Sequence, residues 1–235
     1  MKLKQYIPPS VKVFLKVSML SIKDILTLNI LKYVSANGKK TVLPVRQTLE
    51  QSIVTNEYVQ HKIENLLLAT EKINHIIIPP GKQFSFNKIV GNPSAANGFK
   101  ESRSIKNGIV VPEVGGGLCQ LPWIMYHLCL QTGITILERH HHSKDIYNEQ
   151  TRFAPLGSDA TIVYGYKDFK ILNNTTHDIC FVFDVKQTVL SCSICSDASL
   201  PMNEVLFKEE RSVNTVSVKT LINNEFFGED IYTLI

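Results

Sequence analysis

Two segments in the first third of the chain combine apolar and polar positions at the spacing of a helix. In residues 1–35, Pro8-Pro9-Ser10 is a start signal, and Lys12, Lys16 and Lys23 follow it on one helical face. The apolar side chains of this segment lie largely off that face, which leaves two interpretations. The helix either packs on the body with its lysines in water, or it lies on an anionic membrane surface.

The second segment follows Thr55-Asn56-Glu57, which supplies a cap and an acidic residue for a first turn. Its apolar residues recur at helical spacing and predict a helix that ends near His75, before Pro79-Pro80-Gly81. The residues of this apolar stripe are Val59, Ile63, Leu66, Leu67 and Ile73.

Later in the chain, short alternating or apolar runs separated by Gly, Asn and Asp turns predict strands. One helix interrupts them, from about Leu121 to Gln131, and Gly133 is placed to stop it. This helix is apolar nearly all round, which is typical of a buried helix. The expected strands are Phe84–Ile89, Gly108–Val111, Thr135–Leu137, Thr161–Tyr164, Phe169–Leu172, Ile179–Val185, Thr188–Cys192 and two or three more within residues 205–234.

These patterns predict an α+β fold with a β-rich single domain over residues 41–235. Its buried central helix starts at the Gly-Gly-Gly-Leu-Cys-Gln segment, and a helical basic N-terminal arm, residues 1–40, precedes the domain. Of the 235 residues, 44% are hydrophobic and 20% are charged, which is typical of a globular protein. This composition excludes fibrous, repeat and disordered architectures.

Positive charge is concentrated in the N-terminal arm. Residues 1–40 contain eight Lys and one Asp, a net charge of +7, whereas the rest of the chain contains 17 basic and 20 acidic residues. A basic arm on a weakly acidic body favours an anionic surface as the partner of the arm. Because no aromatic-interleaved basic patch or zinc-finger spacing accompanies it, we expect no nucleic-acid partner.

Lysines interrupt the apolar stretch over residues 11–31, so the sequence predicts neither a secretory signal nor a transmembrane helix. We therefore expect a cytoplasmic protein, with peripheral contact at the inner membrane face as a further option. Its five cysteines are then reduced thiols. The segment Cys192-Ser193-Ile194-Cys195 suits a thiol pair in a hairpin better than a metal site. We expect no metal and no other cofactor.

The segment Gly115-Gly116-Gly117-Leu118-Cys119-Gln120-Leu121-Pro122 is the densest unusual run of the chain. Pro122 is tolerated only in the first turn of a helix, which puts Cys119 at or beside the helix N-terminus. There the helix dipole and uncovered N–H groups favour a thiolate, and the same groups can hold an oxyanion. A cysteine acyltransferase needs this arrangement, although a lone Cys before an apolar helix is also common in simple packing.

A histidine cluster follows the same helix. The expected strand Thr135–Leu137 leads into Glu138-Arg139-His140-His141-His142-Ser143, and a strand at this position tends to pack beside the helix. A histidine at its exit, His142 or His140, can then act on the thiol as base and later as acid. A solvated loop and a metal site formed by His140 and His142 are the alternatives.

Asp159 precedes a predicted strand and follows a turn. It can orient one of these histidines or pair with Arg139. Its ordinary interpretation is an aspartate that caps the turn.

The order of these motifs resembles the VanW family over about residues 74–185. The resemblance includes the GGG-x-CQ signature of that family and its ER-H-x-H segment. The motifs that carry it are Ile78–Asn87, Gly91, Gly98-Phe99, Gly115–Gln120, Glu138–Ser143, Pro155–Thr161 and Asn173-Asn174-Thr175.

The resemblance implies cysteine-dependent acyl transfer of the L,D-transpeptidase type on cell-wall peptides, and a link to glycopeptide resistance. Cys119 would form the thioester, His142 or His140 would move the proton, and Asp159 would stand beside them. The residues implied to bind substrate or oxyanion are Gly116, Gly117, Gln120 and Arg139.

Arg139 has two interpretations under this resemblance. It meets a substrate carboxylate in two-point fashion, or it forms a structural pair with Glu138 or Asp159. The implied partner of the protein is a peptidoglycan stem peptide or precursor. A non-catalytic module that binds such precursors at the membrane surface is the alternative function, and a metal-dependent hydrolase that uses the histidines is a third.

Overall fold

The computed structural model describes residues 8–106, 109–145, 152 and 154–234. Helices make up 26% and strands 36% of the structure, so the predicted α+β class is confirmed. The first seven residues of the basic arm and Gly108, the expected start of a strand, lie outside the described residues.

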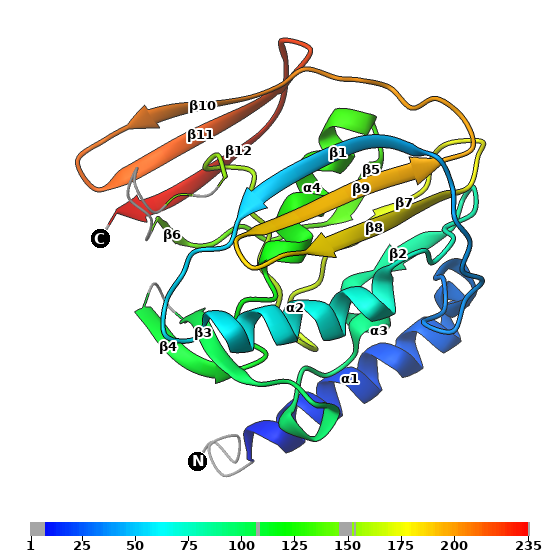
Figure 1. Cartoon of the computed structure of the whole chain (residues 1–235), viewed down its shortest axis with the longest axis horizontal. Helices are drawn as coiled ribbons and strands as arrows, with labels where there is room; N and C mark the ends of the chain where they lie inside the picture. Colours follow the sequence, from blue (N-terminus) through cyan, green and yellow to red (C-terminus); the bar gives the residue numbers. More distant parts are fainter. Residues whose placement is uncertain (1–7, 107–108, 146–151, 153, 235) are drawn as a thin grey trace.

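Figure 1 shows the elements in chain order. The helices, including two short 3-10 helices (η), are α1 Pro9–Leu26, η2 Asn29–Lys32, α2 Val59–Ile73, α3 Phe86–Val90, η3 Ala95–Asn97 and α4 Gln120–Thr132. The strands are β1 Val45–Ser52, β2 Gln83–Ser85, β3 Glu101–Lys106, β4 Ile109–Val114, β5 Thr135–Glu138, β6 Lys144–Asp145, β7 Lys170–Leu172, β8 Ile179–Val185, β9 Val189–Ser196, β10 Val205–Arg211, β11 Thr215–Ile222 and β12 Glu225–Leu234.

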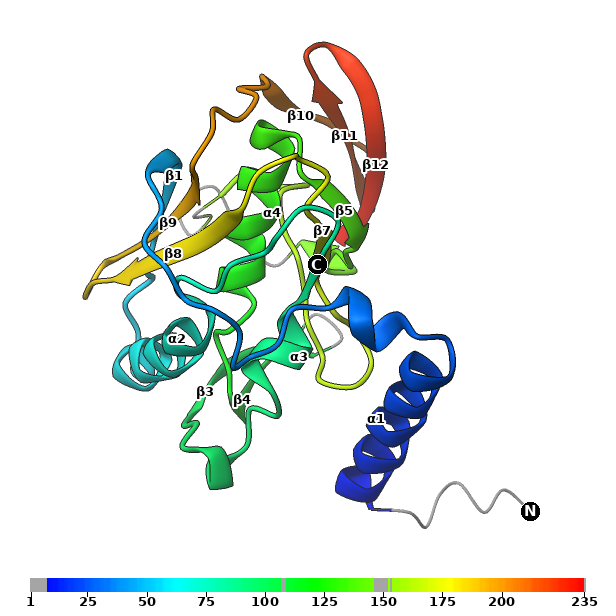
Figure 2. The same cartoon turned by 90° about the vertical axis from the view of Figure 1, so that its right-hand side faces the viewer.

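Helix α4 lies at the centre of the molecule. Its side chains are buried on all sides, and it contacts β1, β9 and β5 (Figure 2). Figure 2 shows the sheet β1-β9-β8 on one side of this helix and the strands β5 and β7 on the other. Gly133 ends the helix in the left-handed conformation, with φ of +68°. Because α4 is buried between these strands, the residues at its two ends are held in fixed positions.

The C-terminal strands form a second sheet, which packs against the chain that follows α4. Strands β10, β11 and β12 are antiparallel neighbours, and the short β6 pairs with β12 in parallel. A small hydrophobic cluster of Leu156, Val216, Val218 and Tyr232 attaches this sheet to the loop after β6. Residues far apart in sequence, near 157 and near 231, are thereby brought side by side.

Two predicted strands are wrong. Within Phe84–Ile89 only the first two residues are strand, because the Ser85 hydroxyl accepts the Lys88 N–H and starts α3. Thr161–Tyr164 is a loop whose Thr161 N–H donates to the His140 carbonyl at 2.7 Å. This loop runs past Cys119 instead of joining a sheet.

The predicted pairing of Cys192 with Cys195 is also wrong. Side chains alternate between the two faces of a strand, so residues three apart point to opposite sides. Cys192 lies in the main core, whereas Cys195 lies in a separate cluster with Ile77 and Cys180, its cross-strand neighbour on β8.

Helix α1 rests on the body by one face. Val13 and Val17 approach the loop at Gly165, and Asp24 forms an ion pair with Lys88 at 2.7 Å. The rest of the helix projects from the body, as Figure 2 shows. Among the described residues, no helix is long and apolar enough to cross a membrane.

Candidate active site

Cys119 is the N-cap residue of α4, and the glycine run shapes the chain in front of it. Gly115 and Gly117 have φ of +80° and +87°, which favours glycine. A Cβ on Gly116 would lie 2.2 Å from the Ser102 carbonyl oxygen, so this position allows the loop to lie directly on β3. The three glycines thus deliver the cysteine to the helix N-terminus along a path that bulkier residues would block.

His142 and Asp159 complete a row of three polar side chains with Cys119. The Asp159 carboxylate accepts hydrogen bonds from His142, at 2.7 Å from its backbone N and 2.6 Å from Nδ1. With Nδ1 occupied, Nε2 is the ring nitrogen left for the thiol, with which His142 interacts. The order acid, imidazole and thiol is the one that orients a base toward a nucleophile.

The environment favours charge separation between the thiol and the imidazole. Burial by itself raises the pKa of Cys119, but the hydrogen bond and positive charge of His142 outweigh it and bring the pKa below its ordinary value. Burial lowers the pKa of His142, but its hydrogen bonds to Asp159 and Cys119 raise it to about 9. Both shifts favour the thiolate–imidazolium form of the pair over the form in which both groups are neutral.

Asp159 is held in place by residues from several parts of the chain. Arg139 donates from Nη2 to the Asp159 carboxylate at 3.1 Å and from Nε to its carbonyl at 2.7 Å. The Tyr232 hydroxyl donates to the same carboxylate. Burial raises the pKa of Asp159, but these partners and His142 bring it down to about 2, so the acid is ionised.

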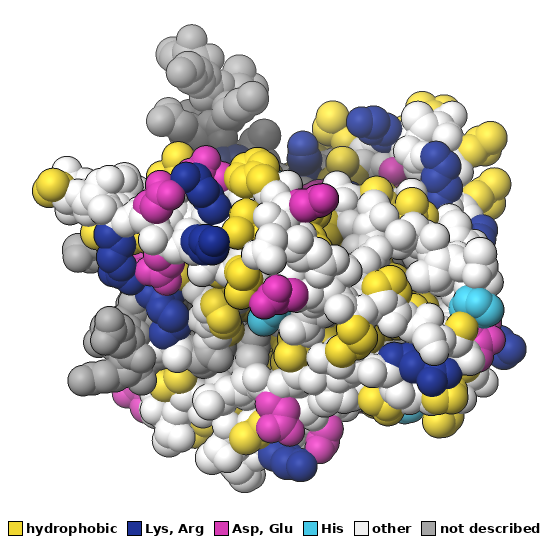
Figure 3. Space-filling model, turned by 90° about the horizontal axis from the view of Figure 1, so that it is seen from above, with side chains coloured by type: hydrophobic (Ala, Val, Ile, Leu, Met, Phe, Trp, Pro, Cys, Tyr) yellow, Lys and Arg dark blue, Asp and Glu magenta, His cyan; other side chains and the backbone are white. Residues whose placement is uncertain are grey.

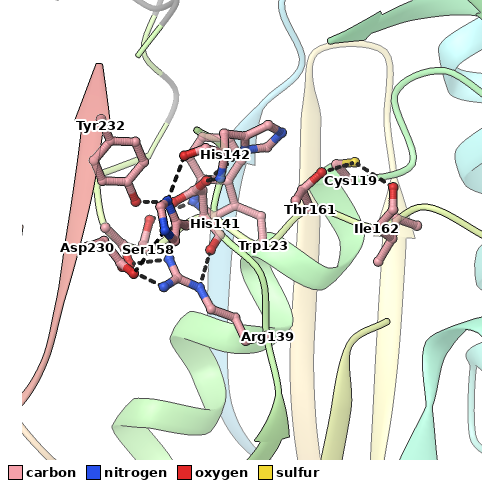
Figure 4. A network of polar contacts seen from close by, with 12 residues as sticks. Cys119, Trp123, Arg139, His141, His142, Ser158, Thr161, Ile162, Asp230 and Tyr232 are labelled. Carbon is pink, nitrogen blue, oxygen red and sulfur yellow. Dashed lines mark hydrogen bonds and ion pairs between the residues drawn. The ribbon is translucent and has the colours of Figure 1, made fainter. Parts of the chain in front are cut away.

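A cavity of about 570 Å³ opens beside the thiol. Cys119, His142 and Thr161 all line it, together with the amide-rich segment before α4. The Thr161 hydroxyl lies 3.7 Å from Sγ of Cys119, and the Ile162 carbonyl oxygen lies 4.0 Å from it (Figure 4). A cavity of this size admits a short peptide segment.

Only some of the residues predicted to bind an oxyanion or substrate have polar groups without a partner among the described residues. In the part of the chain that the structure describes, the N–H groups of Gly117, Leu118 and Cys119 have no acceptor, so they are available to an oxyanion. The Gly116 N–H already donates to the Glu113 carbonyl at 3.0 Å. Gln120 lines the cavity, but its side-chain amide donates to the Ser52 carbonyl at 3.0 Å and serves the fold.

Two other candidates lie away from the thiol. Neither His140 nor Arg139 lines the cavity. The His140 ring pairs with Glu138 at 3.0 Å, whereas the His142 ring pairs with Asp159. The two histidines considered as metal ligands therefore bind different carboxylates. Arg139 pairs with Asp230 at 2.5 Å as well as with Asp159, and it stacks over the Tyr126 ring. These contacts fit the structural interpretation of Arg139, in which it holds the acid that binds His142.

The sequence analysis did not identify four residues of this neighbourhood as candidates. Asp230 and Tyr232 belong to the last strand, and their pattern is that of any strand. Lys62 and Arg103 line the cavity from α2 and β3. Lys62 had a signal, because it falls between Val59 and Leu66 on the apolar side of its helix, where a cation is unusual. Within the described residues, no three His, Cys, Asp or Glu side chains converge in a way that could hold a metal ion.

Comparisons with known proteins agree with the motifs at this site. The sequence model of the family described as "VanW like protein" matches residues 61–195, which include Cys119, His142 and Asp159. The Vancomycin B-type resistance protein VanW of Enterococcus faecalis (strain ATCC 700802 / V583) is 31% identical over 134 residues, 56% of this chain and 49% of the relative.

A second relative, the uncharacterized protein YoaR of Bacillus subtilis (strain 168), is 28% identical over 124 residues, 53% of this chain and 39% of that protein. The match thus spans half or less of the length of the curated relatives. No solved structure matches the chain significantly. Since the family model covers more than half of the residues and all three members of the polar row, the chain belongs to the VanW family.

Proposed function

We propose that this protein is a cysteine acyltransferase of the L,D-transpeptidase type that acts on peptidoglycan stem peptides or precursors. The observation that carries the proposal is the row Cys119–His142–Asp159, which lines a peptide-sized cavity at the N-terminus of a buried helix. The thiol has a lowered pKa, a base within its reach and uncovered N–H groups beside it. These are the three parts that thioester chemistry requires.

The first half-reaction follows from this geometry. The Cys119 thiolate attacks the carbonyl carbon of the bond before a terminal D-residue, and the N–H groups of Leu118 and Cys119 stabilise the resulting oxyanion. The His142 imidazolium gives its proton to the leaving amine. The C–N bond breaks, the D-amino acid leaves, and a thioester on Cys119 remains with neutral His142.

The second half-reaction restores the starting state. An amine of a second stem peptide attacks the thioester carbonyl, His142 takes the proton from that amine, and the thiolate leaves. Asp159 stays ionised throughout and orients the imidazole, which makes it a positioning residue.

The substrate class rests on the family. The name of the Enterococcus relative links that protein to vancomycin resistance. We extend that link to this chain, which makes a peptide of the peptidoglycan type the proposed substrate. A location at the inner face of the membrane is part of this proposal.

The test is a search for the thioester by intact-protein mass spectrometry. The protein is incubated with the tetrapeptide L-Ala-γ-D-Glu-L-Lys-D-Ala, and the expected result is an adduct of the tripeptide on Cys119 with release of D-alanine. The variant Cys119→Ala serves as the blank, and Cys129→Ala, which changes a buried thiol of the same helix, is the matched control. Absence of an adduct, together with alkylation of Cys119 no faster than that of Cys129, would leave the non-catalytic binding module as the better function.

A further inference from the structure

Two cationic side chains line the same cavity as the thiol. Lys62 of α2 and Arg103 of β3 both line the space that Cys119 and His142 line. The stem of Lys62 runs directly beneath the loop, since a Cβ on Gly117 would lie 2.6 Å from Lys62 Cγ. The aliphatic stem of Lys62 thus packs against the same loop that carries the nucleophile.

One carboxylate, that of Glu113, lines the cavity together with these two cations. The charged and acid–base side chains that line the cavity are Lys62, Arg103, Glu113, Cys119 and His142, together with the phenol of Tyr164. Burial and the neighbouring charge of Arg103 lower the pKa of Lys62 to about 8, against an opposing effect of Cys119. Two cations that weaken one another in this way are stabilised when a ligand anion lies between them.

We propose that Lys62 and Arg103 form a subsite for the free carboxylate of the acyl donor, next to the peptide bond that Cys119 attacks. The inference rests on the proposed function and sharpens it, because it limits the donor to peptides that end one residue beyond the reacting carbonyl. The leaving D-residue carries its carboxylate close to the scissile nitrogen. A guanidinium binds such a group in two-point fashion, and an ammonium adds charge. A peptide extended at this end, or amidated there, would lose both contacts.

The first experiment compares two alkylating reagents that differ in charge. Iodoacetate carries a carboxylate, iodoacetamide does not, and the ratio of their rates at Cys119 cancels the thiolate population. We expect the ratio to fall about fivefold in Lys62→Met and again in the double variant with Arg103→Met. Lys100→Met removes an equal charge from an exposed position just before β3 and is the matched control. An unchanged ratio in the double variant overturns the subsite.

The second experiment does not depend on a reactive thiol. Binding of Nα-acetyl-L-lysyl-D-alanine and of its C-terminal amide is measured by NMR titration on the Cys119→Ala protein. Tighter binding of the acid, lost in the Lys62→Met and Arg103→Met double variant, supports the subsite even if no thioester ever forms. Equal binding of acid and amide overturns the subsite and leaves the thioester result standing by itself.

A second inference comes independently from the outer face of α1. Its side toward the body carries Val13 and Val17, whereas the opposite side is apolar and uncovered. Phe14, Met19 and Leu26 are 70%, 67% and 79% exposed. The further exposed apolar residues of this helix, at helical spacing on the same side, are Val11, Leu15, Ile22 and Ile25. By contrast, the face in Figure 3 shows hydrophobic side chains in small patches among charges of both signs.

We infer that this outer face of α1 lies on an anionic lipid surface. Lys12, Lys16 and Lys23 follow one flank of the apolar stripe, so the helix offers a hydrophobic face together with positive charge. Charge complementarity favours acidic headgroups over a second copy of the chain, whose α1 would present the same lysines. Because Val13 of this helix also lines the cavity, the lipid surface would stand close to the candidate active site.

Vesicle sedimentation tests this surface. We expect the full chain to bind vesicles that contain phosphatidylglycerol and to bind pure phosphatidylcholine about tenfold or more weakly. Phe14→Glu with Met19→Glu should abolish binding, whereas Val213→Glu, at an apolar position that is 92% exposed elsewhere, should not. Equal sedimentation of the Phe14→Glu/Met19→Glu variant, or a concentration-dependent dimer that this variant disrupts, overturns the inference.

Discussion

The two cysteines of helix α4 are the same residue in opposite environments. Cys119 stands at the helix N-terminus beside an ionised His142–Asp159 pair, and its pKa lies below the ordinary value. Cys129 stands in the body of the helix, fully buried among apolar side chains, and burial raises its pKa far above that value. A thiol becomes a nucleophile through the charges and N–H groups placed around it.

The largest expected effect is the difference in reactivity between variants that lack one or the other of these two thiols. Cys119→Ala should abolish iodoacetamide labelling under native conditions and all acyl transfer, with little change in stability. Cys129→Ala should keep both reactions and lower the free energy of unfolding by about 1 kcal/mol, because it removes a packed sulfur from the core. Peptide mass mapping and urea unfolding measure the two readouts. Loss of transfer in a folded Cys129→Ala protein would contradict the assignment.

The next effect concerns the base. His142→Gln should reduce acyl transfer by about a hundredfold or more and shift the midpoint of Cys119 labelling upward toward the ~8.5 of an ordinary thiol. His140→Gln, whose ring pairs with Glu138 outside the cavity, is the control and should leave the labelling midpoint in place. A pH profile of alkylation checks both. If His140→Gln shifted the midpoint as much as His142→Gln, the choice between the histidines would be wrong.

A third prediction distinguishes the two roles considered for Arg139. Arg139→Met should destabilise the fold by about 3–5 kcal/mol, because the buried Asp159 and the partly buried Asp230 would keep their negative charges without this partner. Urea unfolding gives this value. If Arg139 instead held a substrate carboxylate, the variant would unfold normally and show a higher KM for the donor with an unchanged midpoint of unfolding.

The smallest effect is the pH dependence of stability from the His142–Asp159 pair. The pKa of His142 is about 9 in the folded state and ~6.5 in the unfolded state. The protonated imidazole therefore contributes its full stabilisation of the fold below pH 6.5, and this contribution is lost as the pH rises through 9. The Asp159 pKa of about 2, below the unfolded ~3.9, adds stability above pH 4 that disappears as the pH falls through 2. The stability difference between wild type and His142→Gln should therefore shrink between pH 6.5 and 9, as urea unfolding at each pH would show. A constant difference across that range would contradict the ion pair.

The local parts of the site could be read from the sequence. Pro122 and the glycine run placed Cys119 at a helix start, and the all-apolar segment after it predicted burial, because both are consequences of short-range backbone sterics and hydrophobicity. The order of the motifs also led to the VanW family, which the comparison confirms. The ends of the strands were predicted less accurately. The strand expected over Phe84–Ile89, for example, stops at Ser85, because the side chain of this residue caps the helix α3.

The sequence by itself thus determined the nucleophile candidate, the buried helix and the basic character of the arm. Which histidine lines the cavity with the thiol, and which acids Arg139 contacts, were decided only by the tertiary structure. His140 and His142 differ in surroundings because Asp159, seventeen residues beyond His142, folds back to bind one of them. Tyr232 binds the same acid from the last strand. A network assembled from segments this far apart depends on long-range packing, and no local pattern encodes which side chains will meet in it.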